Sequence, residues 1–240
     1  MSSAPPANGP GRPRAAAPAA ATSLSSREQI LDAAAALYSE AGFSGSSTRA
    51  IADRVGIRQQ SLYYHFAGKE EILAELLSGS VRPSIDFVEN IEAQVPGISP
   101  AGALFALASM DARTLRRTPH NIGTLYLLPE IQDPRYDAFR EQRTQLRDIY
   151  GRLGAAAAHH DVAASMTQQR IGAILIQIAE VVIQLRRDEG NTVADDDDAT
   201  IASSCLRVLG LSTVEIAVAR EEARSVTTAT QLSTQTVRLG

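Results

Sequence analysis

The stretch from residue 48 to residue 69, TRAIADRVGIRQQSLYYHFAGK, constrains the fold more than any other part of the sequence. Its apolar residues recur at helical spacing, which predicts two short helices that share one core. These residues are Ile51, Ala52, Val55, Ile57, Leu62 and Phe66. Gly56 falls between the two helices, where the chain turns with a left-handed backbone that glycine adopts without strain. The pattern therefore predicts a helix-turn-helix motif.

The second predicted helix, from about Gln59 to Phe66, turns a polar face outward. That face carries Arg58, Gln59, Gln60, Ser61, Tyr63, Tyr64 and His65. Guanidinium and amide groups suit base edges, whereas hydroxyl groups and aromatic rings suit the phosphate backbone. Between residues 44 and 69 the formal charge is +3, since three Arg and one Lys stand against one Asp. The whole chain carries −4, so we expect a local positive face on an acidic body.

Residues 26–77 resemble the DNA-binding domain of the TetR family of transcriptional regulators. The sequence that carries the resemblance is SREQILDAAAALYSEAGFSGSSTRAIADRVGIRQQSLYYHFAGKEEILAELL, in which LYYHFAGKEEIL is the most specific run. The resemblance is strong over about a fifth of the chain and elsewhere extends only to the helix layout. It implies an all-α fold, with an N-terminal three-helix helix-turn-helix DNA-binding domain followed by a helical ligand-binding and dimerisation domain.

The resemblance also implies roles for individual side chains. In the family, positions that match Thr48, Tyr63, Tyr64, His65 and Lys69 commonly contact the DNA backbone, and positions that match Arg58, Gln59, Gln60 and Ser61 lie at or near base edges. Arg49 adds positive charge and completes the predicted DNA-binding set. Two alternatives stay open, since His65 also suits a purely structural contact and Tyr63 also suits partial burial.

The helices around the motif are predicted from their caps. Ser25 and Glu28 form a capping-box pattern that begins a helix at Ser26, and Gly42 is expected to end it. Thr48 is expected to cap the first helix of the motif. There its hydroxyl and the unpaired N–H groups of the first turn would form a site for a phosphate.

Composition divides the chain into four parts. Residues 1–24 are rich in Pro, Ala and Gly and are predicted to be a disordered tail. The alternative is an arm whose Arg12 and Arg14 reach phosphates or the minor groove. The other parts are a helix-turn-helix DNA-binding domain at 25–70, a helical effector-binding and dimerisation domain at 71–224, and a flexible C-terminal tail at 225–240.

The part of the chain after the DNA-binding domain is predicted to contain helices only. Pro83 is expected to bend or interrupt the helix that begins at Lys69. Further helices are predicted at 100–117, 134–153, 167–187, 198–209 and from Ser212 to about Arg224, with a short apolar segment at 121–128. The helix at 134–153 is expected to end near Gly154. Its expected solvent-exposed face carries Arg140, Glu141, Arg143, Arg147 and Asp148.

The resemblance implies a homodimer that is built by the last long helix pair. That pair maps to residues 167–187 and 198–209, and the wide apolar stripe of the former supports the assignment. It also implies a small-molecule effector that enters the helical body and alters the spacing of the two DNA-binding domains. Candidate pocket residues are Phe105, Met110, Arg113, Asn121, Leu125, Tyr126, Ile149, Ile174, Gln177 and Ile178, with Glu180 as a further polar partner. Core packing is the alternative for each apolar candidate, and the mostly apolar walls favour a hydrophobic or aromatic effector.

The sequence carries no constellation typical of catalysis. It has no Gly-rich phosphate loop, nucleophile elbow or paired-cysteine site, so we expect neither enzyme activity nor a cofactor. His159 and His160 are adjacent and would diverge by about 100° on a helix, so we expect no metal site there. The single cysteine, Cys205, excludes an internal disulfide and fits a reducing cytoplasm. No apolar run approaches the roughly 18 residues of a membrane span, so we expect no membrane partner.

Together with these patterns, the resemblance implies a cytoplasmic, homodimeric repressor that a small, largely hydrophobic effector releases from a palindromic operator in double-stranded DNA. Two other classes stay open. One is a member of the family that needs no effector or that activates transcription. The other is a small helical enzyme or metal-binding protein that shares the fold.

Overall fold

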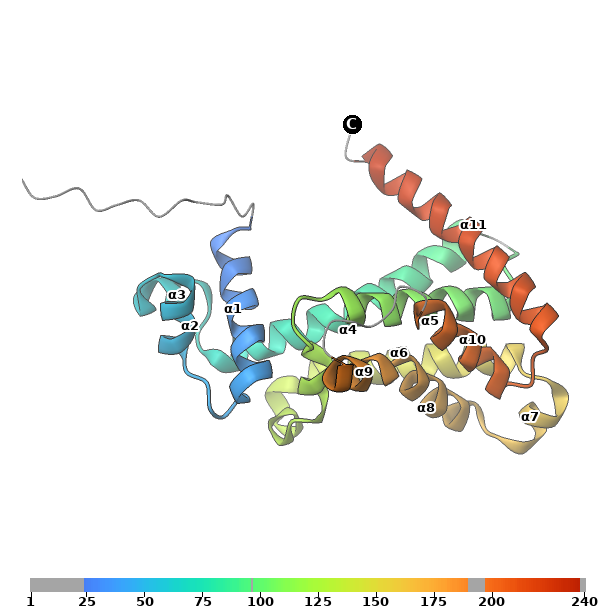
Figure 1. Ribbon diagram of the computed structural model, residues 1–240, viewed down its shortest axis with the longest axis horizontal. Helices are drawn as coiled ribbons and strands as arrows, with labels where there is room; N and C mark the ends of the chain where they lie inside the picture. Colours follow the sequence, from blue (N-terminus) through green and yellow to red (C-terminus); the bar gives the residue numbers. More distant parts are fainter. Residues whose placement is uncertain (1–23, 96, 190–196, 238–240) are drawn as a thin grey trace, which may run out of the picture.

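The computed structural model describes residues 24–95, 97–189 and 197–237, and within those ranges every regular element is a helix (Figure 1). The side chains of Gln94, Glu189 and residues 227–237 are not part of this description. Figure 1 shows an elongated molecule, in which the first three helices form a head at one end. The long helix α4 (Lys69–Gln94) connects that head to the body. The all-α fold expected from the sequence is confirmed.

The head consists of α1 (Ser26–Ala41), α2 (Thr48–Val55), α3 (Gln59–His65) and the start of α4. Tyr38 of α1, Ile51 of α2 and Leu62 of α3 are buried in its core. Burial of an apolar side chain of this size contributes about 1.5–3 kcal/mol. Gly56 ends α2 with φ 80°, in the left-handed region, so the chain turns sharply into α3. The helix-turn-helix motif is therefore confirmed.

The caps of the head agree with the sequence, with one correction. The capping box at Ser25 begins α1, and Gly42 ends it. The residue that caps α2 is Ser47 rather than Thr48, because Ser47 Oγ accepts a hydrogen bond from the Ala50 N–H at 3.1 Å. Ser47 has the extended backbone that an N-cap requires, whereas Thr48 is already helical.

Helix α4 continues through Pro83, so the expected interruption there is wrong. Pro83 lacks an N–H and cannot bond the carbonyl of Gly79, which removes one backbone hydrogen bond. Val81 and Ile85 flank the proline on the same face, and both are buried. Packing of this continuous face holds the two halves in one helix of 26 residues, about 39 Å long at 1.5 Å per residue.

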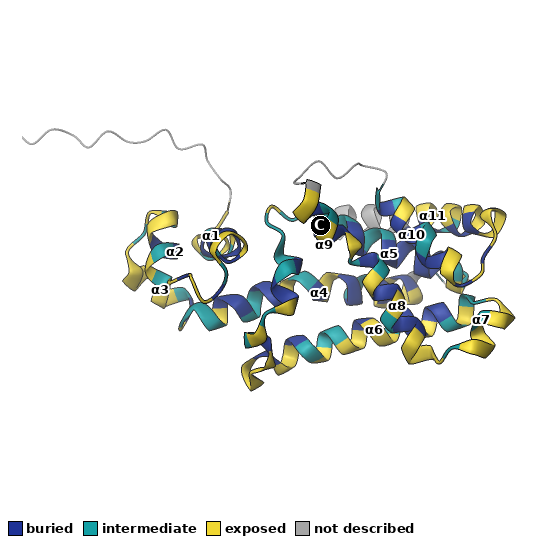
Figure 2. Cartoon of the chain, turned by 60° about the horizontal axis from the view of Figure 1, so that its bottom comes forward, coloured by how far each residue is buried: buried dark blue, intermediate teal, exposed yellow. Residues whose placement is uncertain are grey.

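The body is arranged around α5 (Pro100–Arg117), which begins as expected with Ser99 as its N-cap. The other elements are η1 (Ile122–Leu127), η2 (Pro129–Gln132), η3 (Pro134–Tyr136), α6 (Asp137–Ala157), α7 (His160–Ser165), α8 (Gln168–Ala179), α9 (Val181–Glu189), α10 (Asp197–Val208) and α11 (Thr213–Val237). Helices α4, α6, α10 and α11 all pack on α5. Figure 2 shows buried residues concentrated where the body helices meet.

Two helix boundaries in the body differ from expectation. Helix α6 passes Gly154, because this glycine is a close contact rather than a terminator. A Cβ there would lie 2.5 Å from Leu175 Cδ1 of α8. The single helix predicted at 167–187 is divided at Glu180 into α8 and α9. The carboxylate of Glu180 pairs at this break with Arg143 of α6, so a tertiary contact accompanies the division.

Of the charged face predicted for α6, Glu141, Arg147 and Asp148 are exposed, whereas Arg140 and Arg143 are half-buried. The side chain of Arg143 is only 21% exposed, and its guanidinium lies 4.7 Å from the centroid of the Tyr126 ring. Periodicity grouped Arg143 with the charged stripe. The structure instead places it at the edge of that stripe, where it turns into the body.

The C-terminal helix is longer than predicted. The capping box of Ser212 and Glu215 begins α11 as expected, but the helix continues to Val237 rather than ending near Arg224. Residues 225–237, which the sequence assigned to a flexible tail, thus continue this helix. Helix α11 packs on α5, and extending an anchored helix costs little because each added residue forms one further backbone hydrogen bond. Residues 238–240 and the predicted N-terminal tail through residue 23, with Arg12 and Arg14, lie outside the described residues.

Candidate nucleic-acid interface

Helix α3 has one buried side and one exposed side. Leu62 is fully buried, and Phe66, which follows the helix, lies in the same core. The exposed side carries Arg58, Gln59, Gln60, Ser61, Tyr63 and Tyr64. Tyr64 is 88% exposed, although tyrosine is on average a half-buried residue. The fold thus holds α3 by its apolar side and leaves its hydrogen-bonding groups open to a partner.

Three of the predicted DNA-binding side chains touch one another. Gln59 Nε2 donates to Thr48 Oγ1 at 2.9 Å, and Thr48 Oγ1 lies 3.2 Å from the Tyr63 hydroxyl. Thr48 begins α2 and Gln59 begins α3, where backbone N–H groups lack intrahelical partners, and Tyr63 lies about one turn further along α3. Hydroxyl groups beside a helix N-terminus suit an anionic phosphate oxygen.

Lys69 opens α4, and its ammonium group is occupied within the head. Nζ donates to the carbonyl oxygens of Phe43 and Ser46, each at 3.1 Å, and lies 4.4 Å from the centroid of the Phe43 ring. An ammonium has three N–H donors, so one is left for a further partner. Lys69 therefore also holds the connection between α1 and α2 against α4.

The remaining members of the predicted set differ in exposure. His65 is half-buried, and its ring packs edge-on against Tyr64 with 5.4 Å between centroids. Arg58 and Arg49 are exposed, and Arg49 Nε lies 3.9 Å from Asp53 within the same helix. An exposed pair at this spacing is weak, so it leaves Arg49 available to a phosphate.

Sequence reasoning missed Arg27, which positions α3. Its guanidinium pairs with Glu75 of α4, donates to the carbonyl of His65 at 2.8 Å, and lies 4.1 Å from the centroid of the Phe66 ring. The contact with His65 satisfies a backbone carbonyl at the C-terminal end of α3. No local pattern could reveal this, because Arg27 and Glu75 are 48 residues apart.

The ten residues predicted to line an effector pocket differ in burial and in the hydrogen bonds they make. Phe105, Leu125 and Tyr126 are buried in the body. Arg113 Nε instead donates to Asp198 at 3.1 Å, and Asn121 Nδ2 donates to the Ile183 carbonyl at 2.8 Å. Met110 and Ile178 are half-buried, Gln177 is exposed and donates to Glu180 at 3.2 Å, and Ile174 is 36% exposed.

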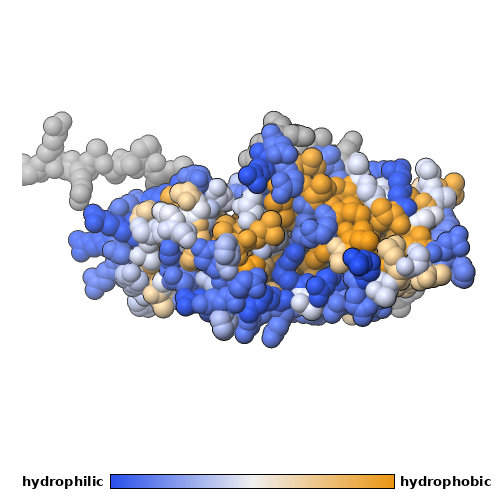
Figure 3. Space-filling model, turned by 90° about the horizontal axis from the view of Figure 1, so that it is seen from below, coloured by the Kyte–Doolittle hydropathy of each residue, from blue (hydrophilic) through white to orange (hydrophobic). Residues whose placement is uncertain are grey.

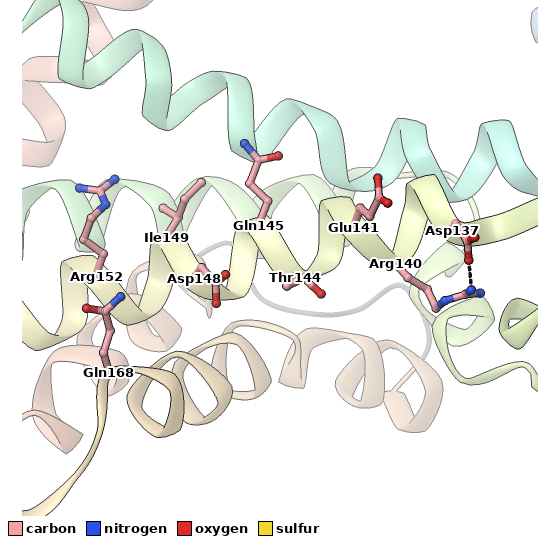
Figure 4. Close-up of a pocket in the computed structure, with 9 residues that line it drawn as sticks. All are labelled: Asp137, Arg140, Glu141, Thr144, Gln145, Asp148, Ile149, Arg152 and Gln168. Carbon is pink, nitrogen blue, oxygen red and sulfur yellow. Dashed lines mark hydrogen bonds and ion pairs between the residues drawn. The ribbon is translucent and has the colours of Figure 1, made fainter. Parts of the chain in front are cut away.

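Ile149 lies in a surface groove of about 640 Å³ along α6 rather than in the core. Figure 4 shows the groove residues spaced along one side of α6, with Gln168 facing them from the start of α8. Most of them are charged or polar, as in the ion pair of Arg140 with Asp137. A groove in which Ile149 is the one apolar side chain among nine lining residues differs from the mostly apolar sites that bind hydrophobic ligands.

A buried carboxylate that sequence reasoning missed lies at the centre of the body. Asp111 of α5 accepts hydrogen bonds from Ser84 Oγ of α4 at 2.6 Å and from the Tyr150 hydroxyl of α6 at 3.0 Å. Burial raises the pKa of Asp111 to about 6, against the two hydrogen bonds that lower it. The available sequence signal was an Asp within the apolar run of the helix at 100–117.

A cluster of Arg143, Glu180 and Tyr126 lies next to Asp111 and also joins separate elements. Arg143 donates to Glu180 Oε2 at 3.0 Å, and the Tyr126 ring below it donates its hydroxyl hydrogen to Ser80 Oγ at 2.8 Å. Burial raises the pKa of Tyr126 well above its ordinary value, so this hydroxyl is protonated. These contacts link α4, η1, α6 and the break between α8 and α9.

The described residues contain no group of three or more His, Cys, Asp or Glu side chains suited to a metal ion. His159 Nε2 lies 3.1 Å from Glu215 of α11, and the other histidine of the pair, His160, is on the surface. Cys205 is buried, and burial raises the pKa of its thiol to about 12. None of the described helices has the length and apolar character of a membrane span.

A helix-turn-helix head on an all-helical body defines a class of DNA-binding transcriptional regulators. The family model "Bacterial regulatory proteins, tetR family" matches residues 30–76. Over 187 residues the chain is 27% identical to the HTH-type transcriptional repressor KstR2 of Rhodococcus jostii, which covers 76% of this chain and 88% of that protein. KstR2 of Mycobacterium tuberculosis is 49% identical over 55 residues, but that match spans only 28% of its length and 23% of this chain.

Among solved structures, AmtR of Mycobacterium smegmatis is similar with a TM-score of 0.73 and 37% identity. That similarity covers 83% of this chain and 94% of AmtR. The chain therefore belongs to the TetR family, and it is a DNA-binding transcriptional regulator. Members of this family are regulators rather than enzymes.

Proposed function

We propose that the protein is a homodimeric repressor that binds a palindromic operator and is released by a small, largely hydrophobic effector. Residues 25–70 would be the DNA-binding unit and residues 71–224 the effector-binding and dimerisation unit. The observation that carries the proposal is the exposed polar face of α3, held in place by buried Leu62 and Phe66. The relatives named as repressors favour repression over activation.

The proposed contacts with DNA fall into two groups. The groups at or near base edges are Arg58, Gln59, Gln60 and Ser61, and the groups on the backbone are Thr48, Arg49, Tyr63, Tyr64, His65 and Lys69. Each well-formed bidentate pair between an Arg or Gln and a base discriminates by about 1–3 kcal/mol. The backbone contacts would fix the register and supply the salt-dependent part of the affinity.

The proposed dimer interface is formed by α8, α9 and α10. Ile174, Val181 and Val208 on these helices are 36%, 41% and 44% exposed. Figure 3 shows a broad apolar patch on the underside of the body, the side on which α8 lies in Figure 1. An exposed apolar patch of this kind favours a protein partner. A second copy seated there would bring two heads to successive major grooves, about 34–36 Å apart.

The effector is proposed to enter the body near α5, whose surroundings are mostly apolar with a few polar groups, as ligand sites usually are. A ligand changes DNA affinity only through its different affinities for two conformations of the dimer. Because α4 is one helix from head to body, a shift at its body end would also move the head. The alternatives are a regulator that needs no effector and an activator.

We further propose that the protein acts in the cytoplasm, where a bacterial operator lies, and that it needs no cofactor. What supports the cytoplasmic location is the exposed polar face of α3, because that face suits DNA.

A gel-shift series with DNA from upstream of the coding sequence tests the proposal. Gln60→Ala should weaken binding to the best site by about 5- to 150-fold, the equivalent of 1–3 kcal/mol. Gln145→Ala is the matched control, since Gln145 is an exposed amide on α6, outside the head. Full operator affinity in both Gln60→Ala and Arg58→Ala would overturn the assignment of α3.

A further inference from the structure

A pocket of about 280 Å³ lies where the head meets the body. Phe43, from the connection between α1 and α2, and Glu70, from the first turn of α4, form its head side. Residues of η2 and η3 form its body side, chiefly Pro129, Glu130 and Tyr136. These residues are separate from the exposed face of α3 and from the surroundings of α5, so the pocket is distinct from the sites proposed above.

Two polar atoms of this pocket are buried without a partner among the described residues. Tyr136 is 2% exposed, and its hydroxyl makes no hydrogen bond there. Glu130 Oε2 is also buried and unpaired, while the other oxygen, Oε1, accepts from Ser44 Oγ at 2.6 Å. Leaving a buried polar group unpaired costs about 1–3 kcal/mol, and native proteins hold few such groups. Two in one small pocket indicate a missing hydrogen-bonding partner.

The charge of the pocket defines that partner. Its lining includes three carboxylates, from Glu70, Glu130 and Asp133, and one cation, Arg135, which pairs with Asp133 at 2.9 Å. A second cation lies beside the lining, because the Lys69 ammonium is 4.4 Å from the centroid of the Phe43 ring, so the acidic groups outnumber the basic ones by three to two. The hydrogen bond from Ser44 holds the pKa of Glu130 below its ordinary value, so Glu130 is ionised at neutral pH. The pocket is thus rich in acceptors and negative charge. It calls for a positively charged hydrogen-bond donor.

The size and walls of the pocket restrict the donor further. A volume of about 280 Å³ lies just below the roughly 300–1,000 Å³ typical of ligand pockets, so the ligand is small. Phe43 and Pro129 give it an apolar wall. The described residues here form no group suited to a metal ion. An organic cation fits these walls better than a bare inorganic one.

We propose that this junction pocket binds a small organic cation, an ammonium or guanidinium group on a short apolar body. Its N–H groups donate to Glu130 Oε2 and to the Tyr136 oxygen, and its apolar part rests on Phe43 and Pro129. The ligand then adds to polar contacts that already join head and body, such as Ser44 with Glu130 and Asp32 with His120 at 3.1 Å. Binding there fixes the orientation of the head relative to the body.

Calorimetric titration of the purified full chain with propylammonium chloride tests the site. Saturable binding is expected, with no binding of 1-propanol or of sodium chloride at the same concentrations. Tyr136→Phe keeps the ring and removes the unpaired hydroxyl, so it should fold at least as stably as wild type and bind about tenfold more weakly. Glu130→Gln should also weaken binding, whereas Glu141→Gln, an exposed carboxylate on α6, should leave it unchanged. Absence of saturable binding, or wild-type binding by Tyr136→Phe, would overturn the proposal.

The regulatory consequence rests on the proposed operator binding and has a separate readout. If a ligand that fixes the head changes the affinity for the operator by some factor, the operator must change the affinity for the ligand by the same factor. Titration of the protein–operator complex should therefore give an affinity for propylammonium that differs from that of the DNA-free protein. Equal affinities would overturn the coupling. Failure to bind any upstream DNA would overturn the proposed function, but the titration of the DNA-free protein would still test the junction pocket.

Discussion

The head and the body bury different kinds of side chain. Among the described residues, the buried charged side chains, Asp111, Arg186 and Asp198, all belong to the body. The described part of the head buries no charged side chain, and Leu62 and Phe66 lie in its core. A region with no buried charge keeps its charged groups available to a partner outside the fold, whereas the stability of the body depends on the charge state of its buried groups.

This difference predicts how the two regions respond to change. Substitutions on the exposed face of the head should alter DNA binding and leave the fold intact. Substitutions of the buried polar groups of the body should alter stability and its dependence on pH, because buried charges interact through a medium of low dielectric constant.

The largest expected effect comes from Phe66→Ala in the head core. Removing a buried phenylalanine costs about 3–5 kcal/mol of unfolding free energy, so DNA binding should be lost at growth temperature. The dimer should persist in analytical ultracentrifugation, because the proposed interface lies in the body. Dissociation of the dimer in the same variant would show that head and body unfold together, which contradicts the difference drawn between the two regions.

The next effect is a change in pH dependence on Asp111→Asn. The pKa of Asp111 is about 6 in the fold against an ordinary 3.8, so the native state binds a proton that the unfolded chain releases between those values. Stability therefore falls as pH rises through this window, by about 3 kcal/mol at 1.36 kcal/mol per unit of pKa. Asp111→Asn should remove this loss and unfold at higher urea concentration than wild type at about pH 7.

Urea titrations at about pH 4 and about pH 7 measure the difference between Asp111→Asn and wild type. The difference should be small at the lower pH and large at the higher one. Asp86→Asn, an exposed carboxylate-to-amide change on α4, is the control and should show no such trend beyond the loss of its surface pair with Arg82. A difference between Asp111→Asn and wild type that does not change with pH would mean that Asp111 is not a buried titrating group.

A smaller effect is expected from Arg58→Ala on the exposed face of α3. Loss of a base contact should cost about 1–3 kcal/mol at the best operator and reduce the preference among operator sequences. Thermal stability should not change, because Arg58 is exposed and makes no capping hydrogen bond from its side chain. A drop in melting temperature with unchanged sequence preference would contradict the separation of fold and function in the head.

The smallest effect separates two neighbouring hydroxyl residues at the start of α2. Ser47→Ala should cost about 1 kcal/mol of stability, because Ser47 Oγ caps the helix. Thr48→Ala should instead leave stability nearly unchanged and weaken operator binding, since the Thr48 hydroxyl contacts Gln59 and Tyr63 on the proposed DNA surface. Equal stability losses in the two variants, measured by urea titration, would show that Ser47 and Thr48 do not have separate roles.

Sequence reasoning succeeded where the determining contacts are local. The capping box at Ser25, the glycine at Gly56 and the Pro after Ser99 each lie within a few residues of the helix end they define. The misplaced cap at Thr48 has the same origin, because two adjacent hydroxyl residues suit the position equally well.

The misses in the body involve partners that are distant in the chain. Asp111 bonds Ser84 and Tyr150 across 27 and 39 residues, and Arg143 meets Glu180 across 37. Neither periodicity nor capping reports which polar residue on an amphipathic helix will turn inward. The proposed DNA-binding residues are a different case. The exposure of those on α3 follows from a local pattern, and the roles of the whole set stay predictions.

The sequence by itself determined that this chain is helical and that it carries a helix-turn-helix motif, because helical spacing, caps and a turn glycine act over one or two turns. Only the tertiary structure decided that α4 continues through Pro83, that Glu180 divides two helices, and that Asp111 is buried. It also decided that Phe43, Glu70, Glu130 and Tyr136 enclose one pocket between head and body. The physical reason is that burial and pairing depend on which distant segments pack together, and no local pattern encodes that.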